Sequence, residues 1–140
     1  MHYWLIKTEP ETFGWAQQMA LGDAGGIWDG VRNHQAANFL RAMQAGDRAF
    51  FYHTGKERQI IGVVEVVRTA FPDPTDPSGR FVSISPRALY TLAAPVPLVS
   101  LREDPRFAEC LLLRQPRLSV MPITAAEWSA IHEIARTAMT

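Results

Sequence analysis

The sequence has 140 residues, of which 47% are hydrophobic and 20% are charged, so it predicts one globular domain with a substantial core and excludes a disordered chain. Its 14 basic residues balance 14 acidic ones, which argues against a protein that coats long stretches of nucleic acid, because such proteins carry a basic excess. Any contact with nucleic acid would have to be local, through arginines gathered on one face.

Cys110 is the only cysteine, which excludes an internal disulfide, a zinc set and a CxxC redox pair. It lies in a leucine-rich segment, where an inert core thiol is expected rather than a nucleophile. The N-terminus has no basic region followed by a long apolar run, and no apolar stretch approaches the ~20 residues of a membrane span. We therefore expect a cytoplasmic protein in a reducing interior, without a membrane partner.

The chain begins with a strand that is expected to be central. Residues 3–6 are all apolar or aromatic, and Pro10 must end the strand because it cannot donate to a ladder. Lys7 and Thr8 therefore lie at the end of a central strand, which is a common place for binding residues. A short helix is predicted over residues 11–21.

Residues 27–40 carry the densest run of mixed chemistry in the chain. Trp28 precedes an Asp-Gly pair, which suggests a strand that leaves the sheet at a turn. Asn33 can cap a helix that begins at His34. An aromatic face, a tight turn and a helix N-terminus with free N–H donors are the geometry of a pocket wall. A core tryptophan beside an ordinary cap is the alternative, and the segment by itself favours that alternative.

The remaining predicted elements are a mixture of helices, strands and loops. A helix over 34–43 is ended by a left-handed Gly46, and a hairpin of strands 48–53 and 59–67 follows it. A loop over 70–79 leads to strands over 81–85 and 87–90, which Pro86 separates, and to an extended segment over 94–98. One or two short helices over 101–113 and an extended segment over 117–122 complete this part of the chain. Gly62 indicates a bulge or a close approach. Thr124 and Glu127 form a capping box that starts the last helix. This order predicts a mixed α+β domain around a strongly curved sheet.

The usual catalytic and metal-binding signatures are missing. The Thr-Gly-Lys at 54–56 lacks the upstream glycine spacing of a P-loop, and the four histidines have no metal-ligand spacing. We therefore expect no catalytic set, no metal and no cofactor. What remains is a group of aromatic and hydrogen-bonding residues near strand ends, which suits a planar, polar ligand such as a nucleobase. The group consists of Lys7, Thr8, Trp28, Arg32, Asn33, Phe51, Tyr52 and His53.

Each of these residues also has a purely structural interpretation. Phe51 and Tyr52 point to opposite faces of a strand, so at least one of them belongs to the core. His53 can be the partner of a backbone group, and Lys7 and Arg32 can be solvated charges. The core is expected to hold the other tryptophans, which are Trp4, Trp15 and Trp128.

Five segments, in order, resemble the EVE domain family of the PUA-like superfamily, which is related to the YTH readers of methylated adenine in RNA. They are YWLIKTEP at 3–10, WDGVRNHQA at 28–36, FYHT at 51–54, GVVEV at 62–66 and LSVMP at 118–122. The resemblance implies a single domain over 1–140, built as a PUA-like curved mixed β-barrel with helices packed around it. It also implies a non-enzymatic module that reads a modified nucleobase, with modified cytosine in DNA favoured and RNA left open. Association with other nucleic-acid-processing proteins, such as restriction or defence systems, is a further implication, whereas the oligomeric state stays open.

The resemblance assigns candidate ligand-binding residues by position. Trp28 matches the cage tryptophan of YTH-like domains, and six further residues match positions around the same cavity: Lys7, Thr8, Asn33, Phe51, His53 and Ser119. The family usually has serine in place of Thr8 and tyrosine in place of His34. The loop that follows Pro74 is short, so only Phe81 is available there as a second cage aromatic.

Two other functions stay open at this point. Lys7, Thr8 and Glu65 supply the residue types of the small amide hydrolases found among ASCH-type PUA-like domains, in which a lysine of lowered pKa would deprotonate the threonine hydroxyl. An outward-facing Glu65 on a strand is the favoured alternative to that arrangement. The third function is that of a protein-interaction adaptor.

Overall fold

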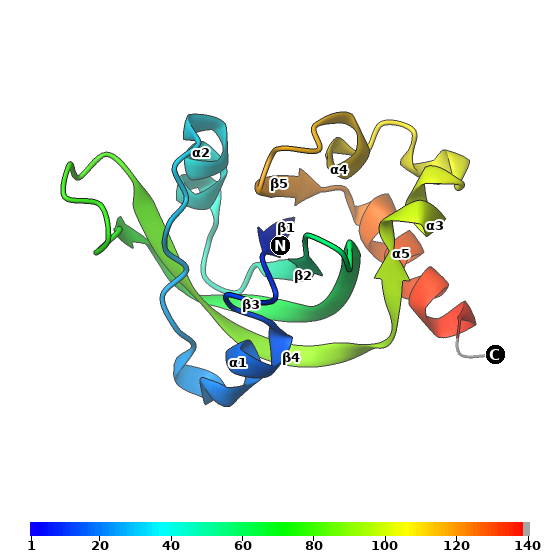
Figure 1. The fold of residues 1–140 in the computed structure, drawn as a ribbon, viewed down its shortest axis with the longest axis horizontal. Helices are drawn as coiled ribbons and strands as arrows, with labels where there is room; N and C mark the ends of the chain where they lie inside the picture. The colour runs from blue at the N-terminus through cyan, green and yellow to red at the C-terminus, as the bar shows by residue number, and fades with distance from the viewer. Residues whose placement is uncertain (139–140) are drawn as a thin grey trace.

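Five strands form the sheet at the centre of the fold (Figure 1): β1 Tyr3–Thr8, β2 Arg48–His53, β3 Gln59–Pro72, β4 Val82–Pro97 and β5 Val120–Ile123. The structure is a computed structural model, and it describes residues 1–138. The strand order is β4-β3-β2-β1-β5. β1 runs parallel to β2, and every other neighbouring pair is antiparallel. β1 is therefore central, which agrees with its apolar sequence.

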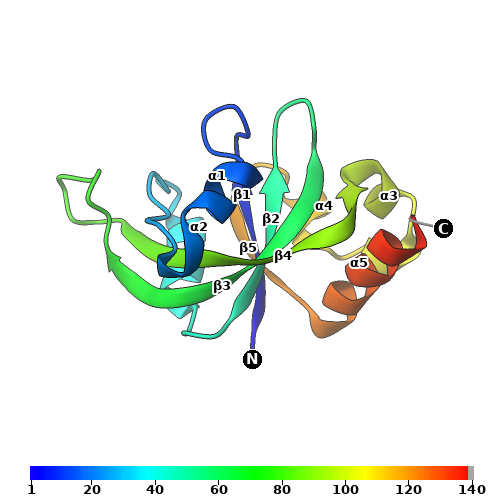
Figure 2. The same ribbon diagram turned by 90° about the horizontal axis from the view of Figure 1, so that it is seen from below.

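In residues 1–138, five helices and two 3₁₀ turns surround the sheet: α1 Trp15–Ala20, η1 Gly22–Ala24, α2 His34–Ala42, α3 Leu98–Arg102, η2 Pro105–Phe107, α4 Leu111–Arg114 and α5 Ala125–Thr137. α1 and α5 both pack against β4, and α2 contacts β4 and β5. Figures 1 and 2 place α2 and α5 at opposite ends of the sheet. α2 therefore lies at the end of the sheet where the segment that contains Trp28 pairs with β4.

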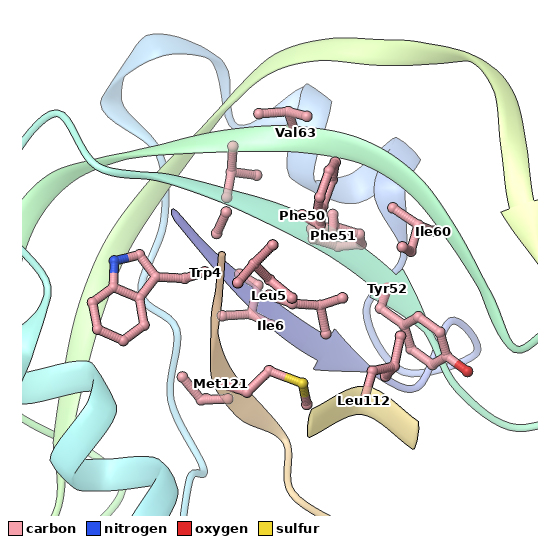
Figure 3. Packing of buried hydrophobic residues seen from close by; sticks show 14 of the residues in the cluster. Trp4, Leu5, Ile6, Phe50, Phe51, Tyr52, Ile60, Val63, Leu112 and Met121 are labelled. Carbon is pink, nitrogen blue, oxygen red and sulfur yellow. The ribbon is translucent and has the colours of Figure 1, made fainter. Parts of the chain in front are cut away.

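The core extends over both faces of the central strands. Phe50 and Phe51 are neighbours on β2, and both are fully buried, although adjacent strand residues point to opposite faces. The Phe50 ring stacks on Trp128 of α5 with 4.1 Å between centroids, and the Phe51 ring packs edge-on against Trp15 at 5.1 Å. Figure 3 shows Leu5, Ile6 and both phenylalanines in this core. Each face of β2 thus has its own aromatic cover.

Several predictions from the sequence are confirmed. β2 spans residues 48–53, and residues 54–58 form the turn of the predicted hairpin. Gly62 lies at a register shift, and a β-carbon there would come within 2.4 Å of the Trp15 ring. The Thr124 hydroxyl oxygen accepts a bond from the Glu127 N–H at 3.1 Å, and the Glu127 carboxylate accepts one from the Thr124 N–H at 2.9 Å. The capping box therefore forms as predicted.

Other predictions are wrong in their boundaries. β3 continues to Pro72, so the loop begins at Asp73 rather than at residue 70. β4 is continuous through Pro86 and takes in the predicted extended segment up to Pro97, where α3 follows, because register shifts against β3 accommodate its prolines. α2 ends at Ala42 with the next residue extended, so Gly46 does not cap the helix and instead lies in the turn that follows.

The mixed α+β class is confirmed. β4 and β5 lie at the two edges of the sheet, and within residues 1–138 the sheet is open rather than a closed ladder of strands. The long strands β3 and β4 bend strongly (Figure 1), which gives the sheet the predicted curvature.

Candidate functional site

A cavity of about 460 Å³ opens where β1 ends and α2 begins. Three segments meet there: the end of β1 with the turn after it, the chain that leads into α2, and Ser119 just before β5. The lining residues are Lys7, Thr8, Thr12, Phe13, Ile27, Trp28, Asp29, Gly30, Val31, Arg32, Asn33 and Ser119. We refer to it as the Trp28 cavity.

Trp28 belongs to the core and to the cavity wall at once. Its backbone N–H donates to the Ile84 carbonyl oxygen at 2.8 Å, which forms an isolated bridge to β4. Its ring meets Phe51 edge to face at 5.6 Å and Phe13 at 6.1 Å, and the residue is 8% exposed. The two interpretations of this tryptophan, core residue and pocket wall, are therefore both correct.

Asp73 holds the segment that carries Trp28. Its buried carboxylate accepts bonds from the Gly30 N–H at 2.8 Å, from Nη1 of Arg32 at 2.8 Å, and from both the N–H and the hydroxyl of Thr75 at 2.7 Å. Burial opposes ionisation of this carboxyl, but these bonds outweigh burial and lower its pKa to about 2. Gly30 has a φ of 82°, which the turn requires and which favours glycine. We call this arrangement the Asp73 latch.

Lys7 and Thr8 make structural bonds at the floor of the cavity. Lys7 Nζ donates to the Pro116 carbonyl oxygen at 2.9 Å, and the Thr8 hydroxyl donates to the Phe13 carbonyl oxygen at 2.8 Å. Partial burial lowers the pKa of Lys7, because an ammonium group loses hydration there. Lys7 retains N–H donors that can be directed into the cavity.

Asn33 and Ser119 complete the polar part of the wall. Asn33 Oδ1 accepts a bond from the Ala36 N–H at 2.9 Å, which confirms the predicted cap of α2. The Asn33 amide N–H groups donate to no residue within 1–138, so they remain available to a ligand. The Ser119 carbonyl oxygen accepts from the Lys7 N–H at 2.9 Å, which fixes the serine beside the end of β1.

Six of the nine predicted binding residues line the cavity: Lys7, Thr8, Trp28, Arg32, Asn33 and Ser119. Phe51, Tyr52 and His53 do not line it. Phe51 is fully buried beneath Trp28, and Tyr52 is almost fully buried, with Lys7 Nζ 5.6 Å from the centre of its ring. For these two aromatics, the structural interpretation is the one that the packing supports.

His53 has both ring nitrogens occupied. Nε2 accepts a bond from the Trp15 N–H at 3.1 Å, and Nδ1 lies 2.9 Å from the Glu57 carboxylate. The residue that caps α1 is Gly14, which has no side chain, so the free N–H of the first turn takes a partner from β2. The interpretation of His53 as the partner of a backbone group is therefore confirmed.

The second aromatic of the cavity is Phe13 rather than Phe81. Phe81 stacks on His34 with 5.1 Å between centroids, and the Arg32 guanidinium lies 5.4 Å from its ring. Phe13 follows the turn that Pro10 starts, and its N–H donates to the Glu9 carbonyl oxygen at 2.9 Å. Its position three residues after a proline that ends a central strand is the signal that could have identified it.

The hydrolase arrangement does not assemble. Glu65 pairs in register with Arg48, which pairs with Tyr3, so Glu65 lies level with the opposite end of β1 from Lys7 and Thr8. Its carboxylate accepts bonds from Nη2 and Nε of Arg87 at 2.8 and 3.0 Å. Glu65 is therefore held in an ion pair away from the cavity.

Other reactive or ligating groups are sparse. Burial raises the pKa of the Cys110 thiol to about 11, which makes it a poor nucleophile. Residues 1–138 contain no cluster of three or more His, Cys, Asp or Glu side chains that could hold a metal ion. Over the same residues, no helix has the length and apolarity to cross a bilayer.

Comparison with known sequences finds relatives that span the chain. The sequence model of a family described as the EVE domain matches residues 2–134. Thymocyte nuclear protein 1 of Mus musculus is 33% identical over 169 residues, which cover 97% of this chain and 74% of that protein.

Solved structures give the same result at the level of the fold. Rpa0253 from Rhodopseudomonas palustris is 44% identical with a TM-score of 0.92, over 98% of this chain and 94% of that one. Human THYN1 protein, solved in complex with 5-methylcytosine-containing DNA, is 29% identical with a TM-score of 0.88, over 96% and 98%. The MmI1 YTH domain shares the fold at 13% identity, with a TM-score of 0.61 over 99% and 98%.

Proposed function

The chain belongs to the EVE domain family, and we propose that it is a non-enzymatic module that binds nucleic acid by holding a modified base in the Trp28 cavity. A modified cytosine in DNA is the favoured ligand. The observation that carries the proposal is a cavity of about 460 Å³ with two aromatic rings and several unpaired polar groups on its wall. The complex of human THYN1 protein with 5-methylcytosine-containing DNA supports the choice of ligand.

The lining groups match the chemistry of a cytosine. A planar base can stack on one of the two rings, Trp28 or Phe13, and meet the edge of the other, since the rings are nearly perpendicular at 82°. The donors on Lys7 and Asn33 suit the ring nitrogen and carbonyl acceptors of cytosine. The Asp29 carboxylate suits its exocyclic amine.

A base can reach this cavity only outside a stacked duplex. Extrusion of a base costs a few kcal/mol, and less for a mismatched or single-stranded base. The chain has no net charge, so nonspecific attraction to the phosphate backbone adds little affinity. We therefore expect single-stranded or weakened sites to be bound more tightly than intact duplex.

The contacts of the candidate catalytic residues favour binding over turnover. Lys7 and Thr8 both donate to carbonyl oxygens of the chain, and Glu65 is paired with Arg87. We also assign the open, curved sheet to the PUA-like architecture, an assignment that the likeness to the MmI1 YTH domain supports.

The test is a set of fluorescence-anisotropy titrations with oligonucleotides that differ only in one cytosine or 5-methylcytosine. The wild-type protein should prefer the modified strand. Trp28→Ala should reduce that preference to about one, because stacking on an aromatic contributes about 1–3 kcal/mol per base. Phe13→Ala, at a partly exposed ring, should weaken the preference if Trp28→Ala does not fold.

The matched control is Phe71→Ala, which removes a partly exposed aromatic that contacts Arg68 outside the cavity. This variant should keep the wild-type preference. Equal binding of the modified and unmodified strands by the folded wild-type protein would show that the proposed function is wrong.

A further inference from the structure

A second hollow, of about 390 Å³, lies directly beside the Trp28 cavity. Its lining residues are Asn33, Gln35, Gln115, Pro116, Arg117 and Leu118. We propose that this hollow, called the flanking groove below, binds the nucleotide that neighbours the base held in the cavity, with Arg117 on its phosphate. The inference rests on the proposed function and extends it to the path of the strand.

The groove and the cavity share a wall. Asn33 lines both hollows, and Ser119 of the cavity follows Leu118 of the groove in the chain. Lys7 Nζ donates to the Pro116 carbonyl oxygen at 2.9 Å, which ties the groove segment to the cavity floor. If a nucleic-acid strand places one base in the cavity, its neighbouring nucleotide therefore lies next to the groove.

Arg117 differs from the other arginines near the cavity. Arg32 is paired with Asp73 at 2.8 Å, and Arg114 with Glu109 at 3.2 Å. Arg41 donates to the side-chain oxygen of Asn38 at 2.9 Å. Arg117 is exposed and makes no ion pair or hydrogen bond with any residue in 1–138. A guanidinium without an anionic partner is free to make the charge-assisted bonds that a phosphate accepts.

The rest of the lining suits a nucleotide better than a protein segment. Gln35 and Gln115 each carry donors and an acceptor, and neither side chain bonds to a residue within 1–138. Four of the six lining residues are polar, and of the two apolar ones, Pro116 and Leu118, Leu118 is almost fully buried. A peptide helix would need an apolar groove, whereas amides and one cation can hold a sugar, a phosphate and a base edge.

The geometry also gives Arg32 a new role. The sequence makes Arg32 a candidate ligand-binding residue, but its guanidinium is bound by Asp73 and donates to the Thr75 hydroxyl at 2.9 Å. We therefore place the phosphate contact in the groove, which Arg117 lines, rather than at the latch.

The experiment compares wild-type protein, Arg117→Ala and Arg136→Ala in anisotropy titrations over a range of salt concentrations. The probes are single-stranded DNA oligonucleotides with cytosine or 5-methylcytosine at one position. Arg117→Ala should weaken both probes by the same factor, about tenfold, and should lower the slope of log affinity against log salt by about one. Binding of free 5-methyl-2′-deoxycytidine, measured by calorimetry, should not change, because the nucleoside has no phosphate.

Arg136→Ala is the matched control. Arg136 is exposed, has no partner in residues 1–138, and lies on α5, which is at the opposite end of the sheet from α2 (Figure 1). If Arg117→Ala and Arg136→Ala have the same affinity for the oligonucleotides while the wild-type protein prefers 5-methylcytosine, the role proposed for the flanking groove is wrong and the proposed function stands. If Arg117→Ala lowers affinity but the wild-type protein has no such preference, the groove stands as a strand contact and the proposed function is wrong. Absence of any oligonucleotide binding by the folded wild-type protein would overturn both.

Discussion

Two tryptophans with the same exposure, 8%, lie on opposite faces of β2 and have opposite surroundings. Trp128 is stacked between Tyr3 at 4.3 Å and Phe50 at 4.1 Å, with ring planes within about 30° of parallel. Trp28 instead meets Phe51 and Phe13 edge to face and borders a cavity. Exposure alone therefore does not separate a sealed core aromatic from a pocket wall, whereas ring geometry and the adjoining hollow do.

The two faces are also closed by different means. α5, a helix of 13 residues with a capping box, covers the Trp128 face. The Trp28 face is covered by an irregular segment that the Asp73 latch fixes to the start of the loop after β3. One face is stabilised mainly by regular packing and the other by polar bonds to one carboxylate, so the two should respond differently to mutation and to pH.

The largest effect is expected at the sealed face. Trp128→Ala should lower the free energy of unfolding by about 3–5 kcal/mol, because it leaves a cavity between two stacked rings. Trp28→Ala should cost less, since water can enter the space beside the existing cavity. Chemical denaturation of both variants measures the difference, and equal losses would contradict the distinction between the two faces.

An intermediate effect is expected at the Asp73 latch. The pKa of Asp73 is about 2 in the folded protein and 3.8 for an unperturbed aspartate, so its ionised form contributes roughly 2 kcal/mol of stability. Because the folded-state pKa is depressed, this contribution is present above pH 3.8 and is lost as the pH falls through about 2. Asp73→Asn should therefore be less stable at pH 7 and should lose less stability between pH 5 and pH 2.

The measurement for the latch is the unfolding free energy of both proteins as a function of pH. Glu11→Gln, at an exposed carboxyl that bonds to no residue in 1–138, is the control and should follow the wild-type curve. A parallel pair of curves for wild-type protein and Asp73→Asn would show that the latch carboxylate does not contribute in this way.

The smallest effect is expected at the cap of α5. Thr124→Ala should lower the free energy of unfolding by about 1 kcal/mol, because the Glu127 N–H loses its acceptor. Thr124→Ser keeps that acceptor and should recover most of the loss in thermal denaturation. Neither variant should change the preference for a modified base, so a changed preference would mean that the two faces are coupled.

Local sequence patterns predicted the parts of the fold whose causes are local. The hairpin around residues 54–58 and the capping box at Thr124 depend on neighbours within a few residues, and both form as expected. The end of β3 and the continuity of β4 were missed, because exposed polar residues and prolines there are typical of loops. Only pairing between the two strands holds those segments extended.

The candidate site was predictable in outline but not in its supporting contacts. Trp28, Lys7 and Asn33 were found from their places at strand and helix ends, and from the family resemblance. Asp73 was missed because its partners Gly30 and Arg32 lie more than 40 residues away in sequence. A bond of that span leaves no periodic signal, and neither does the buried contact between His53 and Trp15.

The place of β1 between β2 and β5 has a consequence for how the protein is made. β1 lies at the start of the chain, yet its partner across Tyr3 is Ile123. A ribosome must therefore synthesise the chain through residue 123 before this strand loses its free edge, and such distant pairing slows folding. Lys7 and Ser119 come from these same two regions. The cavity should thus be complete only after β5 has been synthesised.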